Sequence, residues 1–415
     1  MLSQVLAHLR CAPVALCAVA VLAAGCSTKG APDAVATVDF PESEAATPEN
    51  RWETREEALT DIFVQMDTGV VEPALARFVD EARLLDDRVQ EWSDLRDEPS
   101  HLAAQEQWRT TMMAWQYLES AQIGPVAPAY YTRAGLGLRD EVYSWPSSNL
   151  CLVDQTAAYQ SWSSPDFFED YLPNVYGLDA LEYLLFVDTT DNACPDAVDI
   201  NATGTWVELG EDGVERARAQ LAAVLSAGLV EVGSELHTSW RNDYAPMLAT
   251  AQGSQGPIPS AQGSEQADVL NEVRLAWAYV DMFVQNRKLC APLGMSDCTG
   301  ADYLDEGEHT LSGMGLAAIH QNLVAFQDMF TGRDGPGFDD LLVMEGHGEL
   351  AASFKVELSE AIEAAAALSE VETIDPDDVR LHALHQEVVD ISLMLEADLS
   401  DALCMELHLH ICDCE

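Results

Sequence analysis

Positive charge is scarce in this sequence. Its 415 residues include 71 Asp and Glu but only 20 Lys and Arg, which gives a formal net charge of -51 at pH 7. Only three of the basic residues are lysines, Lys29, Lys288 and Lys355. A surface this acidic repels nucleic acid and anionic lipid, so the composition argues against both as partners. It is typical of a solvated, salt-tolerant surface and is compatible with attraction of cations.

Several catalytic signatures are also missing. The sequence contains no His-Glu-x-x-His, no Gly-x-Ser-x-Gly and no Walker-type loop. It has no convincing series of alternating apolar and polar residues of the kind that predicts β-strands. Without a strand pattern and without these motifs, the sequence is interpreted as a helical protein. Any chemistry at a site would depend on isolated acidic residues rather than on a known peptidase or nucleotide-binding motif.

The N-terminus contains a short apolar run, from Ala12 to Ala24, behind Arg10. This run is too short for a comfortable membrane span, and the sequence LAAGC that ends at Cys26 matches a bacterial lipobox. We therefore predict a lipoprotein signal peptide over residues 1–25 and acyl chains on Cys26; the alternative is an ordinary cleaved signal.

The predicted lipid anchor would hold the protein on a membrane of the cell envelope. Ser27 follows Cys26, and the lack of Asp at that position favours the periplasmic face of the outer membrane in a Gram-negative cell. Residues 26–50 are rich in Ala, Pro, Thr and acids without periodicity, so they are predicted to form a flexible tether.

Helical periodicity dominates the rest of the chain, which is 48% hydrophobic over its full length. Apolar residues recur at steps of three and four, as in Leu381, Leu384, Val388, Ile391 and Leu395, where Asp375 and Pro376 predict the helix start. Further helices are expected at about 54–68, 70–92, 101–122, 212–238 and 349–368, and residues 135–173 are expected to form a long irregular, pocket-forming segment.

The predicted fold class is all-α, with two packed helical bundle domains. The N-terminal bundle is placed at residues 51–205 and the C-terminal bundle at residues 206–415.

Seven cysteines follow Cys26 and are interpreted as disulfide candidates in an oxidising compartment. Cys290 and Cys298 flank a loop that contains glycine, Cys151 and Cys194 could clamp another loop, and Cys404 could pair with Cys412 or Cys414; spacing leaves the connectivity open, and the odd number leaves one cysteine over. The tail also contains His408 and His410, a soft-ligand composition for copper or zinc, but disulfide bonding is the favoured interpretation.

Three acids are candidate metal ligands. Glu119 continues the apolar stripe of Trp108, Met112 and Trp115, and a buried carboxylate needs a cation, either an arginine or a bound metal. In the sequence YGLDALEYLLF, Asp179 and Glu182 lie one helical turn apart and repel each other unless a positive group lies between them. A hard divalent cation or an arginine would satisfy both acids.

Several blocks of sequence together resemble the imelysin-like family of envelope proteins, in its lipoprotein branch. The blocks occur in order along nearly the whole chain: AWQYLESAQIGP (114–125), YSWPSSN (143–149), NVYGLDALEYLLF (174–186), NRKLCAPLG (286–294), DEGEHTLSGMGLAAIHQNLVAFQDMFTG (305–332), GFDDLL (337–342) and LMLEADLSDAL (393–403).

The resemblance implies an all-helical fold of two bundles with a site at their junction. The family's hallmark, Gly-x-His-x-x-Glu, is proposed to bind metal, and its positions correspond here to Gly177, Asp179 and Glu182, so aspartate replaces the histidine. Two carboxylates shift the preference toward harder ions, and the loss of the imidazole weakens the case for a metallopeptidase.

From this resemblance and the acids, the leading hypothesis is an envelope lipoprotein that binds a divalent metal ion such as iron, or a metal-bearing ligand, in metal uptake. One alternative is a metallopeptidase of the imelysin type. The other is a non-catalytic module that docks an envelope protein partner through residues 135–173.

Overall fold

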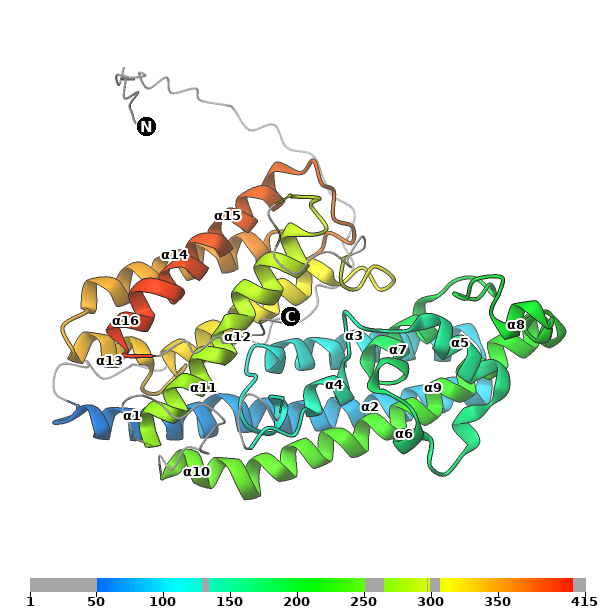
Figure 1. Ribbon diagram of the computed structural model, residues 1–415, viewed down its shortest axis with the longest axis horizontal. Coiled ribbons are helices and arrows are strands. Elements are labelled where there is room, and N and C mark those ends of the chain that lie inside the picture. Colours follow the sequence, from blue (N-terminus) through cyan, green and yellow to red (C-terminus); the bar gives the residue numbers. More distant parts are fainter. Residues whose placement is uncertain (1–50, 129–133, 251–264, 297, 299–306, 406–415) are drawn as a thin grey trace, which may run out of the picture. The chain divides into compact units, whose positions relative to one another are not determined.

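The computed structural model describes residues 51–128, 134–250, 265–296, 298 and 307–405 (Figure 1). The predicted signal peptide and the predicted tether, including Cys26, lie in residues 1–50, outside the described residues. Cys412 and Cys414 also lie outside them. Every regular element in the described part of the chain is a helix, and no strand occurs there. The predicted all-α class is confirmed.

The first half of the fold consists of long helices joined by a region of short ones. Its elements are α1 (Arg55–Gln65), η1 (Met66–Val71), α2 (Glu72–Leu95), α3 (Glu98–Glu119), η2 (Gly124–Val126), α4 (Leu138–Val142), α5 (Leu150–Tyr159), η3 (Ser161–Ser163), α6 (Phe167–Asp170), η4 (Pro173–Val175), α7 (Leu178–Phe186) and α8 (Asp199–Ala202). Three short α-helices therefore lie within residues 135–173, where the sequence predicted an irregular segment; the helices are too short to show a periodic pattern.

The second half contains the longest helix and the C-terminal hairpins. Its elements are α9 (Thr205–Ser239), η5 (Trp240–Tyr244), α10 (Ala245–Ala249), α11 (Glu265–Tyr279), η6 (Val280–Cys290), α12 (Gly315–Thr331), α13 (Phe338–Met344), α14 (Gly348–Ala366), α15 (Val379–Met394), η7 (Leu395–Leu399) and α16 (Ser400–Ala402). The last long helix begins later than predicted: Asp378, not Asp375, is the N-cap of α15, and its carboxylate accepts a hydrogen bond from the Arg380 backbone.

Helix α2 packs against α3 and α9, and these three long helices run alongside one another (Figure 1). Its buried positions recur at steps of three and four and are Leu75, Phe78, Val79, Ala82, Leu85, Val89 and Trp92. Gly233 of α9 allows close approach, because a Cβ there would lie 3.1 Å from the Phe78 ring. The helix expected at about 70–92 therefore buries one amphipathic face in the core.

Helix α12 connects this group to the C-terminal hairpins, since it packs against α3 on one side and α14 on the other. Helix α15 packs in turn against α14 and η6. One cluster of buried apolar side chains extends from α1 to the residues after α16. Helix α9 begins where the second predicted domain begins, and it contacts α2, α5 and α7. The division of the chain into two domains at residues 205 and 206 stays a prediction.

Within the described residues, Thr205–Ala249 is long and apolar enough to cross a membrane by length and composition. However, 56% of its most apolar window is buried inside the fold, which is the property of a core helix.

Two of the predicted disulfides are confirmed, Cys151–Cys194 and Cys290–Cys298. The first joins the start of α5 to the segment that follows α7, and the second closes the loop after η6. The predicted partners of Cys404 lie outside the described residues, so that pairing stays a prediction.

A buried ion pair reinforces the segment that the first disulfide holds. Arg218 of α9 is 4% exposed, and its guanidinium donates to Asp154 Oδ1 from Nε (3.2 Å) and Nη2 (3.0 Å). The same guanidinium donates to the backbone carbonyls of Thr189 and Asp191, both at 2.6 Å. Arg218 therefore fixes residues between α7 and α8 as well as compensating a buried carboxylate.

Replacing Arg218 should destabilise the fold strongly, because Asp154 would keep a buried and uncompensated charge. We expect Arg218→Ala to lower the free energy of unfolding by about 3–5 kcal/mol. Arg216→Ala is the matched control on the same helix, since the Arg216–Asp212 pair is exposed and such pairs contribute about 0–1 kcal/mol. Urea unfolding followed by circular dichroism measures both; equal losses in the two variants would contradict the interpretation.

Candidate functional site

The predicted acid pair lies on α7, a short helix that is buried along almost its whole length. Leu178, Leu181 and Leu185 are all 0% exposed, as their spacing predicts. The N-cap is Gly177, with φ of +90°, a conformation that side chains with a Cβ rarely adopt. A Cβ at this position would also lie only 2.7 Å from the carbonyl oxygen of Val142. The glycine is therefore required for α7 to start this close to α4.

Asp179 is 6% exposed and is held by the segment that follows α4. Its Oδ2 accepts hydrogen bonds from the hydroxyls of Ser144 (2.6 Å) and Ser148, and its Oδ1 accepts one from the Ser144 backbone (3.4 Å). Burial raises the pKa of Asp179 above its ordinary value, and the serine hydrogen bonds oppose this shift only in part.

Glu182 lies one turn later on α7 and is 7% exposed. Its partners lie in the turn before α12, far along the chain. Its Oε2 lies 2.8 Å from Nδ1 of His309, and its Oε1 accepts from the Ser312 hydroxyl at 2.8 Å and from the Ser312 backbone at 3.0 Å. The two acids of α7 thus face different partners, and among the described residues no arginine pairs with either of them, contrary to one of the two possibilities left open by the sequence.

His309, like the three serines, belongs to this site although the sequence pattern gave no reason to choose it as a ligand. It lies in the turn before α12 with φ of +55°, an uncommon conformation for a residue other than glycine. Its ring is stacked near Tyr143, with centroids 5.6 Å apart, and meets the edge of Trp108 at 5.5 Å. Burial alone would lower the pKa of His309, but the carboxylates of Glu182 and Glu308 raise it above its ordinary value of 6.5.

Behind this histidine, Lys288 forms a fully buried polar centre. Its Nζ, on η6, donates to Gln116 Oε1 and Asn322 Oδ1, both at 2.8 Å, and lies 2.9 Å from Glu308 Oε2. All three ammonium protons therefore have a partner. Glu308 also accepts from the Tyr143 hydroxyl at 2.9 Å. Burial alone would raise the pKa of Glu308, but Lys288 and His309 lower it below its ordinary value.

Glu119, the third predicted metal ligand, is paired with an arginine. Its Oε1 accepts from Arg139 Nε (2.9 Å) and Nη2 (2.6 Å), and Glu119 is 0% exposed. Nη2 of Arg139 also donates to the Trp145 carbonyl at 2.8 Å. Burial raises the pKa of Glu119, whereas Arg139 and Lys288 oppose that shift. Of the two possibilities stated for Glu119, the structure shows the ion pair.

The predicted ligands therefore do not converge on one point. Within the described residues, no group of three His, Cys, Asp or Glu side chains is arranged to hold a metal ion. The oxygen atoms around α7 come from Asp179, Glu182 and three serines, a donor set that suits a hard cation better than zinc or copper. In this structure the carboxylates of Asp179 and Glu182 accept hydrogen bonds from the serines, and Glu182 contacts His309. A cation bound at α7 would therefore have to replace these hydrogen-bond donors.

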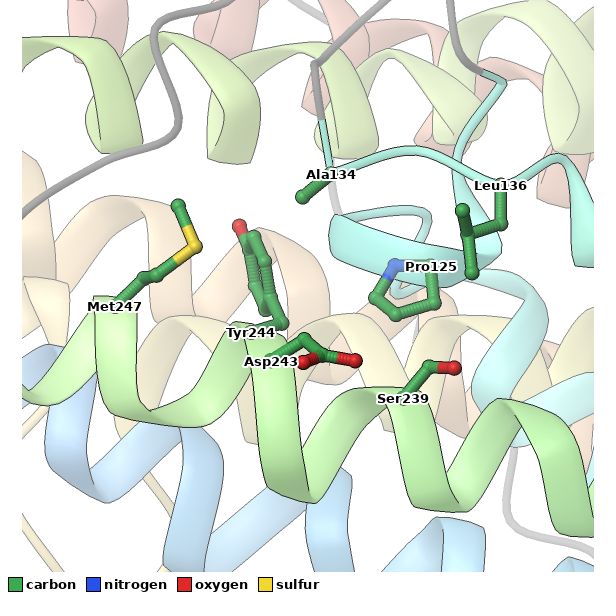
Figure 2. A pocket seen from close by; sticks show the side chains of 7 residues that line it. All are labelled: Pro125, Ala134, Leu136, Ser239, Asp243, Tyr244 and Met247. Atoms are coloured by element: carbon green, nitrogen blue, oxygen red, sulfur yellow. The ribbon is translucent and has the colours of Figure 1, made fainter.

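A hollow of about 440 Å³ lies elsewhere, between η2 and the η5–α10 segment (Figure 2). Its lining is mostly apolar and consists of Pro125, Ala134, Leu136, Ser239, Asp243, Tyr244 and Met247. None of the predicted metal ligands contributes to it, so this hollow and the acids of α7 are separate features.

Comparison with known proteins gives a consistent result. The sequence matches the profile of the family described as imelysin over residues 71–391. The structure resembles an imelysin-like protein from Psychrobacter arcticum, with a TM-score of 0.61, 14% identity, and coverage of 85% of this chain and 98% of that chain. It also resembles a protein named iron-regulated protein A precursor from Parabacteroides distasonis, with a TM-score of 0.62, 15% identity, and coverage of 85% and 96%. No curated protein matches the sequence.

The His309–Glu182 contact should make stability depend on pH. Because the pKa of His309 is raised in the folded state, its stabilising contribution is complete below pH 6.5 and is lost as the pH rises through the raised pKa. We expect the free energy of unfolding of wild type to exceed that of His309→Gln most at low pH, with the difference shrinking above pH 6.5.

Histidine NMR titration tests the same contact directly. His309 should titrate above 6.5 and Glu182→Gln should lower its midpoint, whereas the pKa of His320, which burial lowers, is the internal control. A His309 midpoint below that of His320 would contradict the assignment.

Gly177 should tolerate alanine poorly. Gly177 has φ of +90° and ψ of -170°, a conformation that is almost confined to glycine and costs other residues about 1–3 kcal/mol. Gly177→Ala adds the contact with Val142, so we expect the larger loss of stability there. Gly204→Ala is the comparison, because Gly204 has the left-handed α conformation, with φ of +83° and ψ of 6°, and a Cβ added there would meet nothing within 4 Å. Thermal unfolding measures both variants; an equal decrease in Tm would contradict the requirement for glycine at residue 177.

Proposed function

The chain belongs to the imelysin family, and from that premise we propose that it is a cell-envelope protein that binds a divalent cation, iron or a similar ion, at Asp179 and Glu182 of α7. The proposal concerns binding in metal uptake and includes no hydrolytic step. A relative of the same fold is named as an iron-regulated protein, which supports iron as the first cation to examine.

The observation that carries the proposal is the way in which the buried carboxylates are compensated. Glu119 has Arg139, Glu308 has Lys288, and Asp154 has Arg218. Asp179, by contrast, accepts only from serines and the backbone, and among the described residues neither it nor Glu182 forms an ion pair with Lys or Arg. Two adjacent buried carboxylates that have only one titratable histidine for compensation favour a bound cation.

The donor chemistry narrows the kind of ion. Carboxylate and hydroxyl oxygens are ligands that hard divalent cations prefer. With aspartate at the position where the family's motif has histidine, α7 supplies two carboxylates and no imidazole. His309 is the nitrogen donor that contacts Glu182, at 2.8 Å, and is itself the group that a cation would displace or recruit. Fe²⁺, Mn²⁺ and Ca²⁺ are therefore better candidates than Zn²⁺.

The proposed location rests on the sequence. The lipobox ending at Cys26 and the acidic, unpatterned stretch after it support a lipid-anchored protein on the periplasmic face of the outer membrane. Such an anchor would hold the binding site in the compartment through which imported metal ions pass. An envelope protein partner is part of the same proposal, because a bound ion has to be delivered to a transporter.

Isothermal titration of the metal-free protein with Fe²⁺ under anaerobic conditions, and with Mn²⁺, Ca²⁺ and Zn²⁺, tests the proposal. We expect one site per chain, with oxygen-preferring ions bound more tightly than Zn²⁺. The double variant Asp179→Ala, Glu182→Ala should lose about tenfold or more in affinity, because it removes both carboxylates.

A control is needed because the protein as a whole carries a net charge of -51, which attracts any cation weakly. Glu208→Ala, Glu211→Ala removes two exposed acids at the same sequence spacing and should leave the site unaffected. Absence of binding by all four ions, or equal binding by the two double variants, would rule out the assignment to α7.

A further inference from the structure

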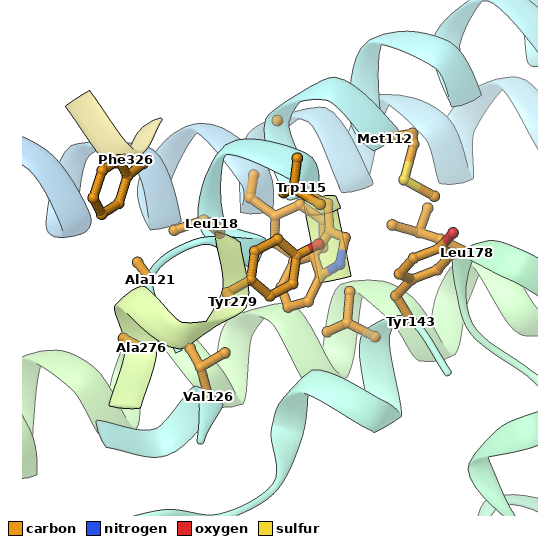
Figure 3. Close-up of a cluster of buried hydrophobic side chains, with 14 of the residues drawn as sticks. Met112, Trp115, Leu118, Ala121, Val126, Tyr143, Leu178, Ala276, Tyr279 and Phe326 are labelled. Carbon is orange, nitrogen blue, oxygen red and sulfur yellow. The ribbon is translucent and has the colours of Figure 1, made fainter. Parts of the chain in front are cut away.

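The turn that contains Glu308 and His309 is held from two sides. On one side, Glu308 accepts a hydrogen bond from the Tyr143 hydroxyl at 2.9 Å, and the His309 ring is stacked near the same aromatic ring. Tyr143 belongs to the cluster of buried side chains of which Figure 3 shows a part. Packing in the core therefore fixes this side of the turn.

The other side of the turn lies against the loop that the Cys290–Cys298 disulfide closes. A Cβ added at Gly307, the residue before Glu308, would lie 3.4 Å from Cγ of Pro292, which is a residue of this loop. That separation corresponds to van der Waals contact between the loop and the turn. The disulfide therefore fixes a surface against which the turn packs.

The disulfide also lies on the path that joins the two partners of a buried ion pair. It begins at the end of η6, just after Lys288, whose Nζ lies 2.9 Å from Glu308 Oε2. By joining Cys290 to Cys298, the bond shortens the path along the chain from Lys288 to Glu308. A shorter path lowers the entropy cost of bringing the two residues together.

The two cysteines differ in their exposure to solvent, which sets the direction of thiol exchange. Cys290 is 3% exposed, whereas Cys298 is only partly buried. The thiolate of an incoming dithiol therefore attacks Cys298 Sγ and forms a mixed disulfide with it, while Cys290 leaves as a thiolate and takes up a proton. The second thiol of the reductant then closes its own disulfide and releases Cys298 as a thiol, so two electrons and two protons pass to the protein.

We infer that the Cys290–Cys298 disulfide is a redox-sensitive switch for the α7 site. In the oxidised form it keeps the turn in place, so that His309 and Ser312 contact Glu182. Reduction by a dithiol loosens the turn and takes these two partners away from Glu182. The effect on cation binding rests on the function proposed above, whereas the movement of the turn requires no metal.

Hydrogen exchange of the metal-free protein, followed by mass spectrometry, tests the movement. The backbone amide of Ser312 donates to Glu182 Oε1 at 3.0 Å, so its exchange rate reports whether the turn is in place. In the variant Cys290→Ser, Cys298→Ser, we expect this amide to exchange at least about twofold faster than in wild type, which is the size of the loop-length effect alone.

Cys151→Ser, Cys194→Ser is the matched control, because it removes the other disulfide and should leave the Ser312 rate unchanged. Amides of the core helix α2 are the internal reference for general unfolding, and their rates should stay at the wild-type value in the first variant. An unchanged Ser312 rate in that variant, an equal increase in both variants, or an equal increase in α2 would overturn the inference. Dithiothreitol added to the folded control variant should produce the same increase at Ser312 without any change at Cys290 or Cys298.

Calorimetric titration with Mn²⁺ separates the switch from the metal site. A cation no longer has to replace the donors of Glu182 once the turn is loose, so Cys290→Ser, Cys298→Ser should bind Mn²⁺ at least about twofold more tightly than wild type. Equal affinity of the two proteins would overturn the switch. Binding by neither protein would remove the proposed function and leave the movement of the turn, which the exchange rates measure by themselves.

Discussion

Compensation of buried carboxylates is the constraint on which this structure depends. The chain has 71 acids and 20 bases, so cations are available for only a few of its carboxylates, and the solvent has to compensate the others. Among the described residues, four of those cations are buried within the fold: Arg139, Arg218, Arg274 and Lys288. Arg139, Arg218 and Lys288 each pair with one buried acid and also donate to other oxygen atoms, which makes the cost of burying these charges tolerable. The acidic surface and the ion-paired interior thus have one cause: the few cations are used for buried carboxylates, and the exposed carboxylates are left to the solvent.

The Lys288 centre shows how this constraint also organises the helices. Its ammonium, on η6, contacts Gln116 of α3, Asn322 of α12 and Glu308 of the turn before α12. Gln116 and Asn322 bond to each other as well, through Asn322 Nδ2 and Gln116 Oε1 at 3.0 Å. Apolar packing alone allows helices to slide past one another, whereas a saturated polar centre fixes their register. The position of His309 beside Glu182 therefore depends on Lys288, because Glu308 precedes His309 in the same turn.

Local pattern was sufficient for the long helices and for part of the site, but not for the short helices within residues 135–173. The buried leucines of α7 follow from their spacing, and Glu119 could be recognised as an acid in need of a partner, whereas Gly177 was named only through the resemblance. Which partner Glu119 has could not be predicted, because Arg139 lies on a five-residue helix with no periodic signal. His309 was missed for a related reason: its contact with Glu182 joins residues 127 apart in the sequence, and its turn has no helical repeat. Contacts of this kind depend on tertiary packing rather than on local propensity.

The buried aspartate Asp179, at the position where the resemblance leads one to expect histidine, has a physical consequence that reaches beyond α7. An aspartate buried at that position needs hydrogen-bond donors, and Ser144 and Ser148 supply them from the segment after α4. An imidazole is nevertheless present at this site. It belongs to His309, which contacts Glu182 from a turn far along the chain and has a raised pKa. Charge at this site is therefore balanced by a group whose protonation can change, whereas the buried acids Glu119 and Asp154 are balanced by arginines, whose charge is permanent over the same pH range.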